Sequence, residues 1–417
     1  MLFTSPRGTT DNLAASSRLW HDIEETARGV FRTFAYGEIR TPIFEEAKLF
    51  SRSLGDLTDI VQKQMFLIKR ETDTFVLRPE ATASIVRAYV ESTMYNVSTV
   101  TKFFYIGPMF RAERPQKGRL RQFHHIGCEA IGSTHPYLDA EVIVLARTLL
   151  GALGLRDFTI RLNTIGCAQD KKSFSVNLRE TLLPHKKSFC EDCQERMSKN
   201  IFRVLDCKNR PCRELILSKK IGHGHLCEPC QDHFRRVREA LDALAVSYEI
   251  DPLLVRGLDY YTRTVFEITH PLLGAQDACV GGGRYDNLVK ELGGPDRGAA
   301  GFALGMERLL MALGVADEPP EEAADGNVYV IPLGDAAMAA GFKLLGEIRA
   351  RGISAEMDYM EGSLKASLRR ADSRKAKVAI VIGDNELNRG VAQLKDMVQG
   401  SQEEVPLADV AAKLSGK

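Results

Sequence analysis

The sequence has no apolar run long enough to cross a membrane, since a spanning helix needs about 20 consecutive apolar residues. Its first 12 residues also lack the apolar core that a secretory signal requires. Of the 417 residues, 27% are charged and 44% hydrophobic, which is close to the average of globular proteins. We therefore expect a globular protein without a membrane partner, located in the cytoplasm, where thiols stay reduced.

The chain also lacks a large excess of either charge, because 56 Lys and Arg residues face 55 Asp and Glu residues. Any nucleic-acid-binding surface must then be local. Two basic stretches qualify, although each could equally be a solvated face. They contain Arg111, Arg114, Lys117, Arg119 and Arg121, and Lys365, Arg369, Arg370, Arg374, Lys375 and Lys377.

The common nucleotide-binding signatures are missing. No GxxxxGK is followed by Ser or Thr, and GGGRYD at residues 281–286 is not a GxGxxG that opens a helix. If a nucleotide binds, arginines must hold its phosphates. The three glycines at 281–283 leave a stretch of backbone without side chains, which a ligand or another chain can approach closely.

The clearest domain boundary is the segment DEPPEEAADG at residues 317–326, which can neither continue a helix nor join a sheet. We expect a linker there, with a first domain over residues 1–325. In residues 326–417, apolar strands alternate with amphipathic helices, which predicts a separate α/β domain. Residues 170–240 hold six of the nine cysteines and are interpreted as an insertion in the first domain.

Three elements are predicted near the start of the first domain. Apolar residues at helical spacing predict a helix over residues 16–35. The next segment, YGEIRTPIFE, predicts a strand with Pro42 at its end or edge, because proline cannot donate a ladder hydrogen bond. Two aromatic-rich runs around the polar turn RPQKGR predict a long antiparallel hairpin over residues 101–132.

The hairpin carries the most informative pattern. Side chains alternate between the two faces of a strand, so every second residue shares a face. One face of the first strand has Tyr105, Gly107, Met109, Arg111 and Glu113, and one face of the second has Arg121, Phe123, His125, Gly127 and Glu129. If these faces coincide, arginines, carboxylates, a histidine and aromatic rings look into one site. A solvent-facing polar sheet would alternate in the same way, but the opposite face of the second strand is too mixed for a core.

Arg308 is a further candidate for anion binding. The segment GFALGMERLLMAL at residues 301–313 predicts a strand that runs into a helix, with Arg308 in the first turn. Free backbone N–H groups at that end of a helix favour anions. The alternative is an ordinary surface salt bridge.

Several segments together resemble one enzyme family. FYIGPMFRAERPQKGRLRQFHHIGCE resembles motif 2 of class II aminoacyl-tRNA synthetases, and GFALGMERLLMAL resembles their motif 3. RGLDYY and GGGRYDNL resemble two signatures of the histidyl-tRNA synthetases. RGTTD, PIFEEAKLF, LRPEAT and the C-terminal α/β domain match that family in order, so the resemblance covers nearly the whole chain.

This resemblance implies an α+β fold, in which helices flank an antiparallel sheet and a C-terminal α/β domain binds the anticodon. The implied activity is that of a histidine–tRNA ligase, which activates L-histidine with ATP and transfers it to the 3′ end of histidine tRNA. It also implies Mg²⁺ bound through the phosphates, and a homodimer with residues 16–35 and the Pro42 strand at the interface. The alternative is a non-catalytic paralogue, a histidine-sensing regulatory subunit of ATP phosphoribosyltransferase. Such chains lose the RGLDYY arginine and the terminal domain, which this chain keeps.

The resemblance assigns roles around ATP. Arg111 corresponds to the arginine that grips the α-phosphate, and Arg308 to the one that holds the terminal phosphates. Arg256 corresponds to the arginine that bridges the substrate carboxylate and the α-phosphate. Phe123 is similar to the ring that stacks on adenine, and Glu113 to the carboxylate that reads its amino group.

The resemblance also assigns a histidine pocket. Glu129 and Tyr261 correspond to the contacts of the two ring nitrogens, with Tyr260 beside them in RGLDYY. Glu80 and Thr82, within RPEAT, correspond to the holders of the α-amino group. The family usually has glutamine where this chain has His125. This departure implies that activity is weaker or depends on pH.

The resemblance further implies contacts with tRNA. Arg114 and Gln116 are similar to residues that read the extra 5′ guanosine of histidine tRNA. In the C-terminal domain, four basic residues are expected to meet phosphates. They are Arg369, Arg370, Arg374 and Lys375.

The cysteine-rich insertion suggests a structural metal. Two CxxC pairs, Cys190 with Cys193 and Cys227 with Cys230, can surround zinc tetrahedrally, although 33 residues separate the pairs. Because disulfides are disfavoured in the cytosol, the other possibility is plain reduced thiols. We expect zinc on these four cysteines, with Cys207 and Cys212 as alternates.

Overall fold

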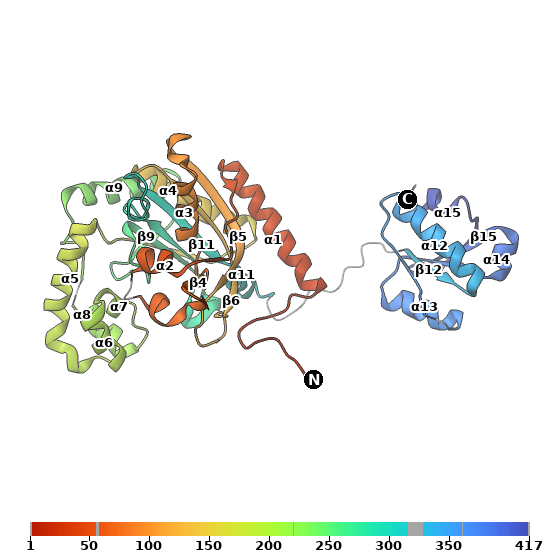
Figure 1. The fold of residues 1–417 in the computed structure, drawn as a ribbon, viewed down its shortest axis with the longest axis horizontal. Helices are drawn as coiled ribbons and strands as arrows, with labels where there is room; N and C mark the ends of the chain where they lie inside the picture. Colours follow the sequence, from red (N-terminus) through yellow and green to blue (C-terminus); the bar gives the residue numbers. More distant parts are fainter. Residues whose placement is uncertain (1, 56–57, 220, 316–327, 361, 416–417) are drawn as a thin grey trace. The chain divides into compact units, whose positions relative to one another are not determined.

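The computed structural model describes residues 2–55, 58–219, 221–315, 328–360 and 362–415 (Figure 1). The chain forms two compact units, Met1–Pro319 and Pro320–Lys417. The expected linker at residues 317–326 lies outside the described residues.

A mostly antiparallel sheet organises the larger unit. Within the described residues it has eight strands in the order β1-β5-β6-β11-β10-β9-β7-β8. The outermost pairs, β1 with β5 and β7 with β8, are parallel, and the pairs between them are antiparallel. The strands are β1 (Gly37–Glu38), β5 (Thr101–Phe110), β6 (Gln122–Ile131), β7 (Thr159–Thr164), β8 (Glu249–Ile250), β9 (Thr262–Thr269), β10 (Ala278–Arg284) and β11 (Ala299–Gly305). The expected α+β fold with an antiparallel sheet is confirmed.

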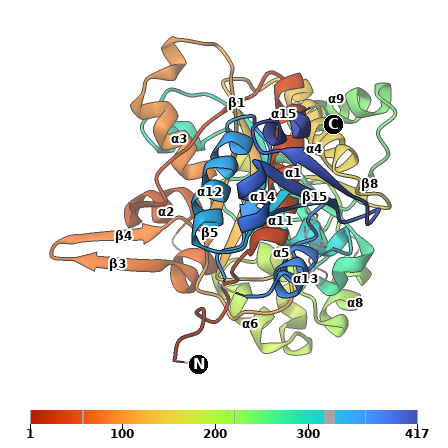
Figure 2. The same ribbon diagram turned by 90° about the vertical axis from the view of Figure 1, so that its right-hand side faces the viewer.

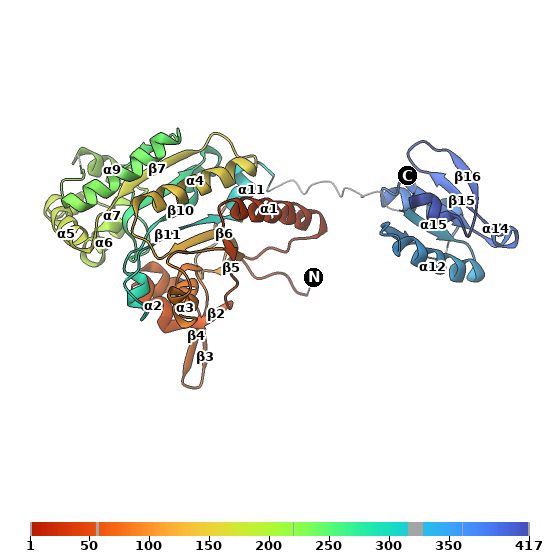
Figure 3. The same ribbon diagram turned by 90° about the horizontal axis from the view of Figure 1, so that it is seen from above.

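One face of this sheet is covered by the helices α1 (Ala14–Thr33), α4 (Pro136–Ala152) and α9 (Glu228–Ala243) (Figure 3). The predicted apolar stripe of α1 is buried, since Phe31 is fully covered and stacks on Phe104 of β5 at 4.6 Å between ring centroids. Burial of such a stripe is what holds an amphipathic helix in place.

The other face carries α2 (Ala47–Leu54), α3 (Thr82–Glu91) and α10 (Leu288–Glu291), together with a three-stranded sheet. This small sheet has the order β2 (Phe44–Glu46), β4 (Asp73–Leu77) and β3 (Phe66–Arg70). The hairpin of β3 and β4 projects from the unit (Figure 2).

The single strand that we predicted over residues 36–45 is wrong. Two short strands, β1 and β2, stand in its place and belong to different sheets. Pro42 lies between them, outside both strands. A proline there interrupts the ladder because it has no N–H to donate, so the chain leaves one sheet and joins the other.

The predicted long hairpin is confirmed, and its register decides whether the two candidate faces coincide. Residue pairs across β5 and β6 are Tyr105 with Gly127, Gly107 with His125, and Met109 with Phe123. The two candidate faces therefore coincide on the side of the sheet that carries α3.

The insertion follows β7 and consists of helices. It contains α5 (Ala168–Leu182), η3 (Leu183–Ser188), α6 (Glu191–Lys199), α7 (Phe202–Leu205) and α8 (Arg210–Ser218), before α9 returns to the sheet. These short helices share a small core of their own, which includes Phe174, Leu178 and Met197.

The smaller unit has a five-stranded sheet in its described part, in the order β13-β12-β14-β15-β16. Its elements are β12 (Val328–Pro332), α12 (Asp335–Arg349), β13 (Ala355–Met357), α13 (Leu364–Ser373), β14 (Val378–Ile382), α14 (Asp384–Arg389), β15 (Val391–Asp396), β16 (Gln402–Pro406) and α15 (Val410–Ser415). Arg370 donates to the buried carboxylate of Asp358 at 2.7 Å, so it holds α13 to this unit. Arg369 on the same helix is exposed.

Among the described helices, none is long and apolar enough to cross a membrane.

A buried ion pair ties the helical layer to the sheet. Arg284 of β10 is fully buried and donates to Asp139 of α4, with an Nε to Oδ1 distance of 2.8 Å. Asp139 also accepts from the hydroxyl of Thr264 at 2.6 Å. Burial opposes the charge of Arg284, but the adjacent Asp139 and Asp286 carboxylates raise its pKa.

We expect Asp139→Ala to lower the free energy of unfolding of the larger unit by about 3–5 kcal/mol, because Arg284 then keeps a buried charge without its main partner. Denaturant titration measures this change. Glu239→Ala on α9, whose Arg235 partner is about half exposed, serves as the control and should cost under about 1 kcal/mol. Equal effects of the two substitutions would contradict the role of the buried pair.

Candidate active site

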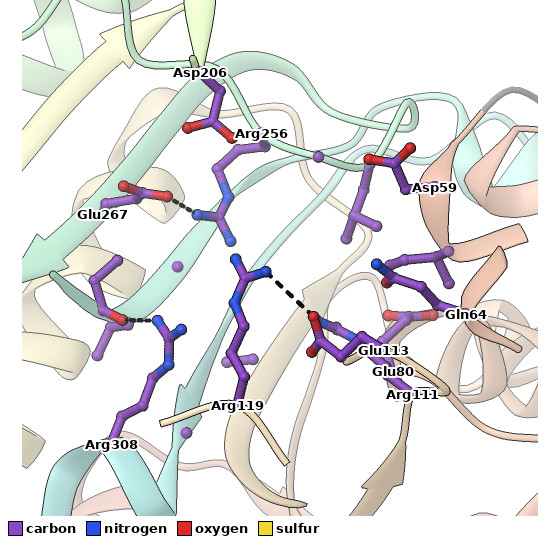
Figure 4. Close-up of a pocket in the computed structure, with 18 of the residues that line it drawn as sticks. Asp59, Gln64, Glu80, Arg111, Glu113, Arg119, Asp206, Arg256, Glu267 and Arg308 are labelled. Atoms are coloured by element: carbon purple, nitrogen blue, oxygen red, sulfur yellow. Dashed lines mark hydrogen bonds and ion pairs between the residues drawn. The ribbon is translucent and has the colours of Figure 1, made fainter. Parts of the chain in front are cut away.

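A cavity of about 660 Å³ lies on the face of the sheet that carries α3. Pockets that bind small molecules commonly have this size. Its walls come from the central strands, from the start of α3 and of α11 (Met306–Ala312), from the hairpin turn, and from the loops of the insertion. Figure 4 shows the guanidinium groups of Arg256, Arg119 and Arg308 directed toward the same part of the cavity.

Arg111 follows the last residue of β5 and lines the cavity. Its Nε donates to the carbonyl of Pro79 at 3.0 Å, and its guanidinium lies 5.1 Å from the centre of the Phe123 ring. Burial lowers the pKa of Arg111 more than the nearby Glu113 and Glu80 raise it. Its charge is therefore stabilised by an aromatic face and a carbonyl, and an anion is the partner that it still needs.

Arg308 stands in the first turn of α11, as predicted. Its Nε donates to the carbonyl of Gly118 at 3.1 Å, and its Nη1 donates to the carbonyl of Ala278 at 2.5 Å. Burial lowers the pKa of Arg308, and repulsion from Arg119 and Arg111 lowers it further. An anion between these groups would relieve that repulsion.

Arg256 forms an ion pair with Glu267 of β9. Burial opposes its charge, but Glu267, Tyr261 and Tyr260 together outweigh this effect, and the pKa of Arg256 is raised. A Cβ atom at Gly281 would lie 2.1 Å from Nη2 of Arg256. The first of the three glycines thus gives room to the Arg256 side chain, and it also lines the cavity. That a ligand approaches this backbone stays a prediction.

Glu129 is the last residue of the candidate face on β6, and its carboxyl group is buried between two hydroxyl groups. It accepts from the Oγ1 of Thr82 at 2.6 Å and from the hydroxyl of Tyr285. Burial raises the pKa of Glu129 to about 8, although both hydrogen bonds lower it. Position 301 on the neighbouring strand requires glycine, because a Cβ atom there would lie 2.0 Å from Oε2 of Glu129.

Glu80 lies beside this carboxylate and caps α3. It accepts from the backbone N–H groups of Thr82 and Ala83 at 2.8 and 2.9 Å, and burial raises its pKa despite these bonds. The rings of Tyr260 and Tyr261 are 4.7 Å apart and complete this part of the cavity wall. The predicted histidine-pocket residues are therefore neighbours in space.

His125 also lines the cavity, as its place in the hairpin predicted. Its Nδ1 is buried without a hydrogen-bond partner among the described residues. Burial holds the pKa of His125 well below its usual range, and Arg111 and Arg308 lower it further. The lowered pKa favours the neutral imidazole near neutral pH. That His125 makes activity weaker or dependent on pH stays a prediction.

The hairpin turn presents different side chains to the cavity and to solvent. Glu113 lines the cavity and forms an ion pair with Arg119 at 3.2 Å. Arg114 and Gln116 are exposed, and the backbones of Gln116 and Arg119 bond to each other across the turn at 2.9 and 3.1 Å.

Three residues of the site were missed by the sequence reasoning. Arg119 was noted only as part of a basic stretch. Glu267 lies directly opposite Gly281 in the strand register, a relation that needs the pairing of β9 with β10. Tyr285 follows the GGGR segment, which drew attention to its glycines and not to the ring.

The expected metal site on Cys190, Cys193, Cys227 and Cys230 is wrong in its composition. The first pair meets Cys207 and Cys212, whereas the second pair meets Cys167 and Asp170. In each group the ligand atoms lie within 4.8 Å of one another, so each could hold a metal ion. The two CxxC pairs start different helices, α6 and α9, which run in separate parts of the insertion.

The antiparallel sheet, with half-buried arginines from motif 2, from RGLDYY and from motif 3 around one cavity, defines a class II aminoacyl-tRNA synthetase. A family model described as histidyl-tRNA synthetase matches residues 8–173 and 194–309. A model described as an anticodon binding domain matches residues 327–417. The chain belongs to the histidyl-tRNA synthetase family.

Full-length relatives agree with this assignment. The chain is 46% identical to a histidine–tRNA ligase of Halothermothrix orenii over 98% of both chains. It is 45% identical to one of Moorella thermoacetica, over 98% of this chain and 97% of the relative. The crystal structure of apo histidyl-tRNA synthetase from S. aureus superposes with a TM-score of 0.79 at 34% identity, covering 99% of this chain and all of the other.

The raised pKa of Glu129 predicts a pH-dependent stability. Between an unfolded pKa of 4.5 and a folded pKa of about 8, the folded protein holds one proton more than the unfolded protein. The contribution of Glu129 to the free energy of unfolding therefore falls as pH rises, by about 1.4 kcal/mol per pH unit. We expect the stability of the ligand-free protein relative to Glu129→Gln to decline in this way between pH 5.5 and 7.5.

Urea titrations of both proteins at several pH values measure this difference. The control is Glu239→Gln, which replaces a half-exposed carboxylate of α9 and should give a difference that varies little with pH. A pH-independent difference for Glu129→Gln would show that Glu129 is ionised in the folded protein.

Proposed function

We propose that this chain is a histidine–tRNA ligase that makes histidyl-adenylate in the cavity described above and passes the histidyl group to tRNA. The observation that carries the proposal is the convergence of Arg111, Arg256 and Arg308 in the same cavity as Glu129. One end of the cavity suits phosphates, and the other suits a small polar ring.

In the first step, a carboxylate oxygen of histidine attacks the α-phosphorus of ATP, and pyrophosphate leaves. Negative charge grows on the phosphoryl oxygens in the transition state, and fixed guanidinium groups stabilise it without reorganising. Arg111 and Arg256 carry this role at the α-phosphate. Arg308 holds the terminal phosphates that become the leaving group.

Recognition of histidine rests on Glu129 and Tyr261 at the ring nitrogens. The hydrogen bonds from Thr82 and Tyr285 fix the Glu129 carboxyl, so a ring nitrogen meets an oriented partner. A side chain without ring nitrogens would leave buried polar groups unpaired, which disfavours its binding. Glu80 with Thr82 holds the α-amino group, and the unpartnered Nδ1 of His125 is free to bond the backbone end of the substrate.

The adenine ring stacks on Phe123 in this proposal. Arg111 already lies against that ring, so nucleotide, arginine and phenylalanine form one stack. Glu113 reads the amino group of adenine, and its bond to Arg119 is then shared or opened. Arg119 adds a further positive charge beside the phosphates.

Metal ions have two places in the proposal. Mg²⁺ accompanies ATP and draws most of its ligands from phosphates and water, and the cavity carboxylate Glu267 is an oxygen ligand of the type it takes. When bound, it neutralises phosphate charge. Zinc is the structural ion that we assign to the insertion, because thiolates are soft ligands that select it.

Residues 1–325 form the catalytic domain, and residues 326–417 form the anticodon-binding domain. Arg114 and Gln116 reach from the exposed hairpin turn to the end of the acceptor stem of histidine tRNA. In the smaller domain, exposed Arg369 is better placed to meet phosphates than Arg370, whose charge is paired with Asp358.

The protein acts as a cytoplasmic homodimer in this proposal. Four large apolar side chains of the β2 and β3 region are 45–55% exposed. Proteins that act as single chains rarely expose large apolar patches. They are Ile43, Phe44, Leu67 and Ile68. Ile43 and Phe44 follow Pro42, so this part of the expected interface is supported by exposed apolar surface.

Arg256→Ala should lower turnover in histidine-dependent ATP–pyrophosphate exchange by at least about 100-fold, because the arginine acts on charge that develops in the transition state. Circular dichroism should report an unchanged fold. Arg147→Ala, at an exposed position of α4, is the matched control and should exchange normally. Near-normal turnover with only a raised Michaelis constant for histidine would contradict the assigned role.

Phe44→Glu combined with Leu67→Glu should convert a dimer into a single chain, because charges would replace the apolar contacts of the interface. Light scattering coupled to size-exclusion chromatography measures the mass. Phe342→Glu changes a comparably exposed phenylalanine of the smaller unit and should leave the dimer intact. A wild-type protein with the mass of one chain would overturn the dimer.

A further inference from the structure

Cysteines stand at the starts of three helices in the insertion region. Cys167, Cys190 and Cys227 are the N-cap residues of α5, α6 and α9. Each is followed three residues later by another metal-binding side chain, namely Asp170, Cys193 and Cys230. The side chains of an N-cap residue and of the residue three positions later lie on the same side of the first helical turn.

The first group joins α6 to the segment that leads into α8. The sulfur atoms of Cys190, Cys193, Cys207 and Cys212 lie within 4.8 Å of one another. Those of Cys190 and Cys207 are 3.8 Å apart, too far for a disulfide at about 2.05 Å. Zn–S bonds of about 2.3 Å in a tetrahedron place two sulfurs about 3.8 Å apart.

Two further features of this group suit a metal site. The backbone N–H of Cys190 donates to the sulfur of Cys212 at 3.2 Å, a hydrogen bond that orients this sulfur toward the other three as second-shell contacts orient metal ligands. Cys193, Cys207 and Cys212 are buried, so water does not surround the sulfurs. The helices around them are short, at nine, four and nine residues for α6, α7 and α8.

The second group is separate and joins the two ends of the insertion. Asp170 at the start of α5 accepts from the N–H and the sulfur of Cys227 at the start of α9, at 3.0 and 3.4 Å. Ordinary Zn–S and Zn–O bonds in a tetrahedron place a sulfur and an oxygen about 3.5 Å apart. Cys167 and Cys230 complete the set, with all four ligand atoms within 4.8 Å.

We propose that the insertion binds two zinc ions, one on Cys190, Cys193, Cys207 and Cys212, and one on Cys167, Asp170, Cys227 and Cys230. The first is a four-thiolate site inside the insertion. The second clasps the points where the chain leaves the catalytic sheet and returns to it. This inference deepens the structural zinc of the proposed function, and its metal measurements do not depend on catalysis.

The first ion also fixes part of the active-site wall. Cys190 and Cys207 line the cavity, together with Asp206, Lys208 and Asn209. The insertion is tethered to the catalytic unit by an ion pair between Arg203 and Asp59 at 2.5 Å. The helices that carry this wall share only a small apolar core. A metal ion that crosslinks them therefore stabilises the wall. The family model matches residues 8–173 and 194–309, so Cys190 and Cys193 lie in the segment between the two matched ranges.

Untagged full-length protein, purified without chelator, should contain two zinc ions per chain by elemental analysis. The double variant Cys190→Ser with Cys193→Ser and the double variant Cys227→Ser with Cys230→Ser should each retain one ion. Limited proteolysis should cut within residues 170–240 faster in both. Cys128→Ala removes a buried thiol outside both groups and should retain two ions.

A Co²⁺ titration of metal-free wild-type protein tests the two sites without relying on a variant that folds. Two equivalents should develop the visible absorption and the thiolate-to-metal charge transfer of tetrahedral sites. One zinc per chain, lost with the first double variant and kept with the second, would overturn the site with Asp170. Protein without zinc that also shows no thiolate-to-cobalt band would overturn both sites.

Discussion

Burial of positive charge is the constraint on which the catalytic unit depends. Arg111 and Arg308 leave water and find backbone carbonyls and an aromatic ring, and their pKa values are lowered as a result. Among the described residues neither forms an ion pair with a carboxylate. In the proposed function, ATP brings negative charge to these guanidinium groups, so ligand binding would supply the partner that they lack.

The same constraint orders the groups around these arginines. Burial lowers the pKa of the His125 imidazole, and the neighbouring arginines lower it further. Burial also raises the pKa of Glu129 to about 8, although its hydroxyl partners lower it. Glycine allows two of these side chains to approach the sheet closely, Arg256 at Gly281 and Glu129 at Gly301. A cavity with a cationic end and a neutral end follows from this placement. The proposed function assigns the first to phosphates and the second to the histidine ring.

The sequence was most informative where a simple period governs the structure. The period of two along the hairpin predicted which side chains of β5 and β6 share a face, and the helical spacing of Ile23, Ala27 and Phe31 predicted the buried side of α1. It was less informative where distant segments meet. The opposition of Glu267 and Gly281 needs strand pairing, and the cysteine groups depend on the paths of several short helices, so spacing alone joined the wrong pairs. The pKa of His125 depends on burial and on arginines from other motifs, which no local pattern reports.

The central claim is that the cavity activates histidine and no other amino acid. Its most direct test is ATP–pyrophosphate exchange by the full-length protein, measured with each standard amino acid in turn. The account predicts rapid exchange with histidine and background exchange with the others, including those of similar size. A protein that binds histidine but exchanges no pyrophosphate, or one that exchanges equally well with another amino acid, would contradict it.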